Sequence, residues 1–386
     1  MPSPPSSRGP SGRFDVISSV GGEVAQSFIP GPIPRPADLD LLGKQDAIGA
    51  ANRAVGALDA ISILLPSTEL FVYMFVRKEA VLSSQIEGTQ STLAELLEAE
   101  AAESAPRSDD LTETSSYVAA LDRGTARVRE GHPLTARLFN ELHELLLGQG
   151  RGSEKLVGEY RRSQNWVGGT RPGNATYVPP PAESLAEAMG QLELFVNRPA
   201  PGDSALVRAG LAHAMFETIH PYEDGNGRMG RMLVPLMLMR EKALRDPLLY
   251  ISLFLKENRD VYYGLLQRTR TESAWDEWID FFLEAVTSTA GAAVQTARAL
   301  TQLFERDRER IREERSRPSA VLDVHEFLQR HPVRSIPDLA KLTGLSHQTT
   351  SKAIEVMSQL GMLREVTGRK RDRIYVYSEY VEILGR

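Results

Sequence analysis

Twelve consecutive residues, His220 to Arg231, carry more polar chemistry than a structural turn needs. They read His-Pro-Tyr-Glu-Asp-Gly-Asn-Gly-Arg-Met-Gly-Arg, so an imidazole precedes two glycines around an asparagine and two arginines three residues apart. Because Pro221 disfavours the right-handed helical region for the residue before it, the preceding apolar helix should end at His220 and leave the imidazole on a loop. The ordinary pKa of histidine suits a general base near neutral pH.

The glycine-rich turn predicts a site for phosphate. Gly225 and Gly227 allow positive φ on either side of Asn226, and a second apolar helix starts just beyond them. Backbone amides of such a turn, at the N-terminus of a helix, bind anions. Arg228 and Arg231 fall on one face of the first helical turn and can donate forked hydrogen bonds to phosphate oxygens.

Asp224 is the carboxylate of the turn that is placed to hold a hard cation. Mg²⁺ usually needs only one protein carboxylate when phosphates and water supply the other ligands. The stretch lacks both the glycine-lysine pattern of a P-loop and the ligand spacing of a zinc protease. We therefore predict a nucleotide-phosphate cradle with a base beside it.

The same stretch resembles the signature of Fic-domain adenylyltransferases, His-Pro-Phe-x-[Asp/Glu]-Gly-Asn-Gly-Arg-x-x-Arg, with Tyr222 in place of the usual Phe. The resemblance implies a mainly α fold and transfer of AMP from ATP, with Mg²⁺, to a Ser, Thr or Tyr hydroxyl of a target protein. Removal of AMP, or transfer of another nucleotide, would use the same residues. A nucleotide-sensing DNA-binding regulator is the competing hypothesis, but a sensor has no use for the base His220.

A second segment, Ser83-Ser84-Gln85-Ile86-Glu87-Gly88, resembles the Fic inhibitory motif [Ser/Thr]-x-x-x-Glu-[Gly/Asn] and precedes the signature. The resemblance implies that Glu87 pairs with Arg231 and blocks the place of the ATP γ-phosphate. Ser83 lies four residues earlier, on the same helix face. The alternative is that Glu87 is a solvated carboxylate in the last turn of its helix, where the helix dipole disfavours it.

Residues 164–167 and 175–178 predict a strand pair around a Gly/Pro/Asn loop, and three prolines end the second strand. The matching segment of Fic proteins is a flap that clamps the target peptide by strand addition, with Tyr177 as a flap contact. The alternative is a hairpin that only packs. For adenine, the family resemblance points to the stretch from Glu257 to Tyr263, with Tyr263 favoured over Tyr262, and Met215 is a further candidate wall.

At 386 residues the chain exceeds one ordinary core, so we expect two or three domains. Helical periodicity predicts helices over 48–65, 70–86, 93–100, 111–128, 134–147, 182–196, 203–219, 248–255, 259–269 and 275–317. The predicted units are a Pro-rich, poorly structured or extended arm (1–40), an N-terminal helical region (41–110), a catalytic core (111–290), a connecting helix (291–318) and a C-terminal module (319–386).

The C-terminal module resembles the winged helix-turn-helix that is often appended to Fic cores. Three short helices (321–328, 336–342, 349–360) precede two strands (362–366, 373–377) joined by a basic turn. Its Lys and Arg only slightly outnumber its acids, so DNA contact and protein contact stay equally open. The side chains expected to be exposed on the third helix for groove contact are His347, Gln348, Thr350, Ser351 and Lys352.

Composition excludes some classes of protein. A net charge of −6 provides no global basic field for nucleic acid. The absence of cysteine excludes disulfides and thiolate catalysis, and it fits a reducing cytoplasm. Because no apolar run reaches 18 residues, we expect a cytoplasmic protein without a membrane partner. The sequence leaves the target protein and the oligomeric state open, a homodimer included.

Overall fold

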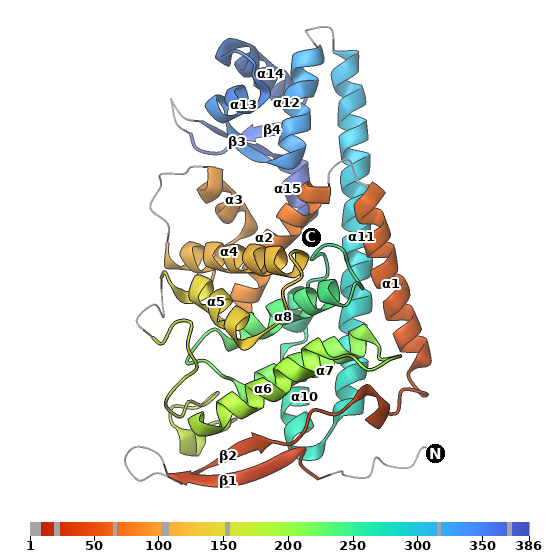
Figure 1. Ribbon diagram of the computed structural model, residues 1–386. Helices are drawn as coiled ribbons and strands as arrows, with labels where there is room; N and C mark the ends of the chain where they lie inside the picture. The colour runs from red at the N-terminus through yellow and green to blue at the C-terminus, as the bar shows by residue number, and fades with distance from the viewer. Residues whose placement is uncertain are drawn as a thin grey trace.

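The computed structural model describes residues 9–18, 24–64, 68–101, 108–150, 155–314, 318–368 and 373–385. The chain is mainly helical, as predicted (Figure 1). The helices before residue 275 are α1 Gln45–Leu64, α2 Thr68–Ile86, α3 Leu93–Ala101, α4 Asp109–Arg129, α5 Ala136–Leu147, α6 Leu185–Asn197, α7 Ala205–Ile219, α8 Asn226–Arg240, α9 Ser252–Glu257 and α10 Arg259–Glu272. No helix in the described ranges has the length and apolar character needed to cross a membrane.

Two helices, α7 and α8, pack against each other at the centre of the molecule. Every residue of α7 after Ala205 is buried, and α8 is buried from Arg228 to Met239. The chain reverses direction between them, so the residues of that reversal are held by two buried helices. Pro235 lies inside α8.

One prediction for the helices was wrong. Helix α9 begins at Ser252, and residues 248–251 are not helical. All four of these residues are buried, and three of them are aliphatic, so a continuous apolar run was mistaken for a helical face.

A single helix of 39 residues, α11 (Trp275–Glu313), runs almost the full height of the molecule, and α1 lies alongside it (Figure 1). The predicted boundary between residues 290 and 291 falls inside this helix. The catalytic core and the connecting segment are therefore joined without a break.

The N-terminal segment differs from the expected arm without regular structure. Strands β1 (Gly12–Ser18) and β2 (Val24–Pro30) form an antiparallel hairpin in which Phe14 is opposite Phe28. The prolines do not prevent pairing, because Pro10 precedes β1 and Pro30 is the last residue of β2. The amide of Phe28 donates to the carbonyl of Val178 (2.9 Å), which fastens the hairpin to the predicted flap.

The flap itself is less regular than predicted. Instead of two strands, residues 164–178 form one bridge, between Val167 and Tyr177, around the 3₁₀ turn Pro172–Asn174. Side chains satisfy the next carbonyls, because the amide of Gln164 donates to the carbonyl of Pro179 (2.8 Å) and Arg161 donates to that of Pro180. The carbonyls of Pro179 and Pro180, which a longer strand pair would use, are therefore already hydrogen-bonded, and the pairing ends after one bridge.

The C-terminal module contains the predicted helices and strands with two additions. Its elements are α12 Pro318–Arg330, β3 Val333–Ser335, α13 Ile336–Thr343, α14 His347–Gln359, β4 Leu363–Glu365, β5 Ile374–Tyr377 and α15 Ser378–Gly385. The sheet order is β3-β5-β4, so β3 and α15 are the additions. On α14, Thr350 is buried, which corrects its predicted exposure, whereas His347 and Gln348 are exposed. The basic turn at 369–372 lies outside the described residues.

The module is fastened to α11 through a buried polar contact. The hydroxyl of Tyr377 donates to Asp307 Oδ2 (2.7 Å), and both side chains are buried. Nearby, Arg306 of α11 pairs with Glu379 of α15 (2.7 Å). The module and α11 therefore share an interface that includes a buried carboxylate.

Changing Tyr377 to Phe should lower the free energy of unfolding by about 1–3 kcal/mol, because it removes a hydrogen bond from the buried carboxylate of Asp307. Thermal and urea melts would measure the loss. Tyr375→Phe is the matched control: it makes the same change on the same strand, and its hydroxyl has no hydrogen bond within the described ranges. Equal losses for the two variants would contradict the role assigned to Tyr377.

Candidate active site

His220 caps the end of α7 in a left-handed conformation, with φ 50° and ψ 59°. This region is uncommon for a residue with a side chain, so the surrounding structure must hold it. Arg161 does so: its Nε donates to the carbonyl of His220 (3.0 Å), and its backbone amide donates to the carbonyl of Pro221 (2.9 Å). The predicted exit of His220 from the right-handed region is confirmed.

The imidazole of His220 is held in its neutral form. Burial, and then the positive charges of Arg161 and Arg270, lower its pKa to about 4. The backbone carbonyl of Glu217 acts in the opposite direction, because it favours the protonated ring. In a neutral imidazole one ring nitrogen carries a hydrogen and the other can accept a proton.

The Gly-Asn-Gly turn opens α8, with Gly225 at φ 76°. The side chain of Asn226 is buried and bonds the backbone of Tyr222 in both directions: its Oδ1 accepts from the amide (2.9 Å), and its Nδ2 donates to the carbonyl (2.8 Å). Asn226 therefore fixes the loop with its side chain, and only its backbone amide is left to face an anion at the helix N-terminus.

Arg231, Ser83 and Glu87 are brought together, although α2 and α8 are far apart in the sequence. Arg231 is buried; its Nε donates to Ser83 Oγ (2.8 Å), and its Nη2 donates to Ser83 O (3.0 Å) and Glu87 Oε1 (2.7 Å). Burial alone would raise the pKa of Glu87, but Arg231 lowers it below the ordinary value, so the carboxylate is charged.

Glu87 approaches the turn so closely that its carboxylate would have to shift to admit a side chain at Gly227. A Cβ on Gly227 would lie 2.3 Å from Glu87 Oε1 and 2.9 Å from Arg231 Nη1. The side chain of Glu87 is 35% exposed, so the carboxylate faces an opening. A negative group thus already occupies the space in front of the N-terminus of α8, where the sequence predicts phosphate.

Arg228 and Asp224 form an ion-pair chain on the other side of the turn. The Nη1 of buried Arg228 lies 3.3 Å from Glu113 Oε2, and its Nη2 lies 3.4 Å from Asp224 Oδ1. Asp224 also accepts from Lys155 Nζ (2.8 Å) and from the amide of Gly225 (2.6 Å). Arg228 therefore stabilises the turn from its buried side, whereas Asp224 is partly open to solvent.

The position of Tyr177 corrects the prediction that its side chain contacts the target peptide. It is only 5% exposed, its ring lies 3.7 Å from the guanidinium of Arg270, and its hydroxyl donates to the carbonyl of Thr218. The residue packs beneath the active-site loop. A target could meet the flap backbone or Trp166, which is 39% exposed, but not this ring.

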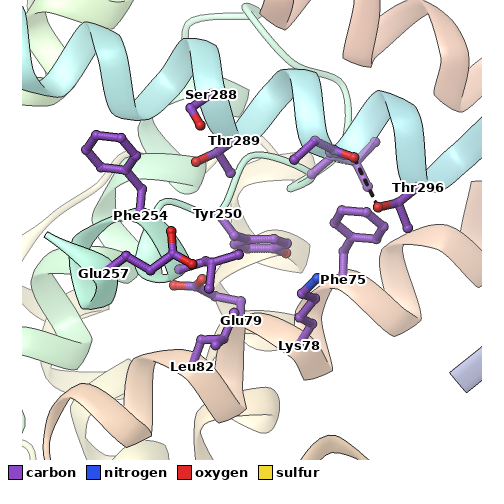
Figure 2. Close-up of a pocket in the computed structure, with 14 residues that line it drawn as sticks. Phe75, Lys78, Glu79, Leu82, Tyr250, Phe254, Glu257, Ser288, Thr289 and Thr296 are labelled. Carbon is purple, nitrogen blue, oxygen red and sulfur yellow. Dashed lines mark hydrogen bonds between the residues drawn. The ribbon is translucent and has the colours of Figure 1, made fainter. Parts of the chain in front are cut away.

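The predicted adenine residues are dispersed. Met215 is buried within α7, and Glu257 lines a separate cavity between α2, α9 and α11 (Figure 2). Tyr263 is 38% exposed, and its pKa is raised by partial burial and then by the charge of Glu87. Tyr262 is buried, and its hydroxyl lies 3.0 Å from His213 Nε2.

Sequence reasoning missed four residues that hold the site. They are Arg161, Arg270, Glu113 and Glu217. Each comes from an element outside the signature or contributes a backbone atom, so spacing within the signature carries no signal for it. The cations Arg161 and Arg270 both lower the pKa of His220.

Residues 133–238 match the Fic/DOC family, and residues 45–126 match the N-terminal region of that family. The chain carries a Fic/DOC family domain. Protein adenylyltransferase Fic of Drosophila yakuba is 31% identical over 233 residues, which is 58% of this chain and 41% of that protein. The Drosophila ananassae protein of the same name is 33% identical over 186 residues, 47% of this chain and 34% of its own length. The chain thus spans about two fifths or less of these relatives.

Two solved structures share the fold. A Fic family protein from Desulfovibrio desulfuricans G20 aligns with a TM-score of 0.53 at 20% identity, over 86% of this chain and 96% of its own. A Fic domain containing signaling protein from Bacteroides thetaiotaomicron aligns with a TM-score of 0.51 at 21% identity, over 65% of this chain and 95% of its own. Because both identities are low, these two alignments show a similarity of fold alone.

Proposed function

We propose that this Fic/DOC protein transfers AMP from ATP to a hydroxyl side chain of a target protein, and that Glu87 restrains the reaction. The supporting observation is that the neutral imidazole of His220 lies at the same turn as a helix N-terminus whose arginine, Arg231, is occupied by Glu87. The adenylyltransferase relatives support the same reaction. Incubation with ATP labelled in its adenosine moiety, followed by detection of labelled protein, tests the proposal.

The residues divide the reaction between them. The acceptor hydroxyl gives its proton to the free ring nitrogen of His220 while its oxygen attacks the α-phosphorus. The bond from that phosphorus to the bridging oxygen breaks, so AMP becomes esterified to the target and pyrophosphate leaves. Amides at Gly225 to Gly227 bind the α- and β-phosphates, and Arg231 binds the γ-phosphate once Glu87 withdraws. Arg228 supports the turn.

The donor set at Asp224 fits Mg²⁺. Within the described ranges no three acidic or histidine side chains gather as a protein-only metal site, so the ion would be held by one carboxylate, substrate phosphates and water. Asp224 is partly exposed, and its nearest cationic partner is Lys155, a surface lysine. When bound, Mg²⁺ would neutralise the charge that develops on pyrophosphate. Lys155 would have to move away from Asp224.

The remaining contacts are assigned by position. Tyr263 is the aromatic residue placed to meet adenine, since Met215 and Tyr262 are buried. The target peptide would add to the flap at the Val167 and Tyr177 bridge through its backbone.

We place the reaction in the cytoplasm and leave homodimer formation as a proposal. For the C-terminal winged helix, DNA or protein contact would use the exposed start of α14.

Removal of AMP is the second candidate function, because it needs the same cradle. The observation in its favour is that Glu87 is charged and faces the turn that would hold the AMP phosphate, where a carboxylate can orient water. Faster loss of pre-installed AMP in the wild type than in Glu87→Gly would favour removal over transfer.

The proton acceptor should stay neutral across the physiological range. Because the pKa of His220 is lowered to about 4, its ring should remain unprotonated from pH 8 down to about pH 5, and it loses this form only below that. The histidine NMR signals would be recorded as the pH changes, and the signal of His220 would be assigned as the one that His220→Ala lacks. That signal should show no chemical-shift transition between pH 5.5 and 8. A midpoint near 6.5 would contradict a half-buried ring flanked by Arg161 and Arg270.

A further inference from the structure

A groove lies between the N-terminal hairpin and the flap, at the end of the molecule where β1 and β2 are found (Figure 1). Its volume is about 490 Å³, several tens of times the ~10–15 Å³ that one water needs. Strand β2 lies beside the 3₁₀ turn Pro172–Asn174 of the flap. The groove is therefore large enough to take side chains of a peptide.

One face of the hairpin presents exposed apolar side chains to this groove. Phe14 and Val16 are two residues apart on β1, and Val24 continues the same face, because it is opposite the residue two positions beyond Val16. Phe14, Val16 and Val24 are 41%, 70% and 64% exposed, and all three line the groove. Adjoining apolar side chains that are this exposed are typical of an interaction site.

The described residues that line the groove include no charged side chain. Their polar side chains, such as Gln26, Thr176 and Gln267, are neutral. A charged group that entered the groove would lose water without gaining an ionic partner, so phosphate and charged side chains are disfavoured. The groove therefore suits an uncharged and largely apolar occupant.

The two walls of the groove are fixed relative to each other. The amide of Phe28 donates to the carbonyl of Val178 (2.9 Å), and Ser27 Oγ donates to the carbonyl of Pro179 (2.6 Å). Both Phe28 and Ser27 are buried. Because the hairpin is already held against the flap, little free energy is lost in ordering these walls when the groove is filled.

The flap wall connects the groove to the residue that carries the base. Tyr177 belongs to this wall, and its hydroxyl donates to the carbonyl of Thr218, two residues before His220. A target peptide that adds to the flap, a step that rests on the proposed function, therefore lies next to the groove.

We propose that the groove binds the segment of the target protein next to the modified hydroxyl, and that it selects segments with apolar side chains at alternate positions. Successive side chains of an extended peptide point to opposite faces, so every second side chain enters the groove beside Phe14, Val16 and Val24. The class of target is then a protein whose acceptor Ser, Thr or Tyr lies in an extended, uncharged and apolar segment.

Two short fluorescein-labelled peptides test this selection. One has Val at every second position around a central Ser, and the other has Thr, which has nearly the same shape, in place of each Val. Fluorescence anisotropy with the full chain should show the Val peptide binding about tenfold more tightly than the Thr peptide. Equal affinities, or no binding of either peptide, would overturn the proposal.

The double variant Val16→Ser, Val24→Ser tests the location, because it removes apolar surface from the hairpin wall. It should bind the Val peptide about tenfold more weakly than the wild type does, while the affinity for a non-hydrolysable ATP analogue stays the same. If this variant folds poorly, Val16→Thr with Val24→Thr keeps the β-branched shape that strands favour and should weaken binding in the same direction.

Leu194→Ser is the matched control, because Leu194 is an apolar side chain of α6 that is 45% exposed and does not line the groove. It should leave binding of the Val peptide unchanged. Equal weakening by Leu194→Ser, or unchanged binding in a folded hairpin variant, would place the peptide elsewhere and refute the site.

A second copy of the chain is the other occupant that an apolar face could take. Self-association of the wild type in sedimentation velocity, lost in Val16→Ser, Val24→Ser, would overturn the proposal in favour of a contact between copies.

The connection to catalysis has its own readout. In the Glu87→Gly background, adding Val16→Ser and Val24→Ser should lower kcat/KM for AMP transfer to the Val peptide about tenfold. Transfer with an unchanged kcat/KM would mean that the groove does not serve the target. Peptide binding without AMP transfer by any variant would refute the proposed function and not the groove, because anisotropy does not depend on catalysis.

Discussion

Replacing Glu87 with glycine should raise AMP transfer by about 100-fold. If the pair with Arg231 is worth ~3 kcal/mol, the arrangement with Arg231 open to the γ-phosphate is only about 1 in 150 of the molecules. Removing the carboxylate makes that arrangement the dominant one. Glycine suits the end of α2, where Gly88 already has φ 105°, so the fold should survive.

Arg231 should remain in place after the change. Its Nε and Nη2 still have Ser83 Oγ and Ser83 O as acceptors, so the guanidinium stays fixed while one side is released for a phosphate oxygen. Because the guanidinium of Arg231 is already held in position, removal of Glu87 should raise the rate of AMP transfer as well as relieve inhibition. Arg231→Ala should not activate, because it frees the turn but deletes the γ-phosphate ligand.

Self-labelling with ATP labelled in its adenosine moiety gives a readout that needs no known target. Gln85→Gly is the matched control, since it loosens the same end of α2 but leaves the Glu87 carboxylate present. Activation by Gln85→Gly equal to that by Glu87→Gly would mean that helix fraying, and not loss of the pair, switches the protein on. Equal labelling of wild type and Glu87→Gly would remove the restraint assigned to Glu87.

The contiguous part of the site could be predicted from the sequence because its geometry is local. His220 ends a helix at a proline, and the Gly-Asn-Gly turn begins the next helix, so chain neighbours are also neighbours in space. The contact between Glu87 and Arg231 spans 144 residues, and only resemblance to a family could suggest it. No periodic pattern joins two positions that far apart.

The wrong predictions share a physical cause. Each concerns a segment whose structure or exposure depends on which distant part of the chain lies against it. Tyr177 is predicted to be a flap contact for the target peptide, but Arg270 of α10 lies against its ring and covers it. Strand alternation alone does not say which face is covered. The N-terminal hairpin was missed for a related reason, because its anchor is the distant carbonyl of Val178.

Replacing His220 with alanine in the Glu87→Gly background should lower transfer by about 10²–10⁴-fold, the range for loss of a general base. The activated background matters because it provides a rate that can fall. Affinity for a non-hydrolysable ATP analogue should stay within a few fold of the parent, since the imidazole acts on the acceptor hydroxyl while Arg231 and the turn amides act on the phosphates.

His220→Gln separates proton transfer from loop geometry. A glutamine side chain keeps a polar group with N–H donors at this position, but it has no nitrogen that accepts a proton. Both variants should therefore be equally inactive, whereas a purely positional role would leave His220→Gln substantially active. If His220→Ala also loses ATP affinity, the loop has rearranged, because φ 50° is uncommon for alanine and the backbone contacts from Arg161 did not suffice to hold it. Transfer at the parental rate by either variant would exclude His220 as the base.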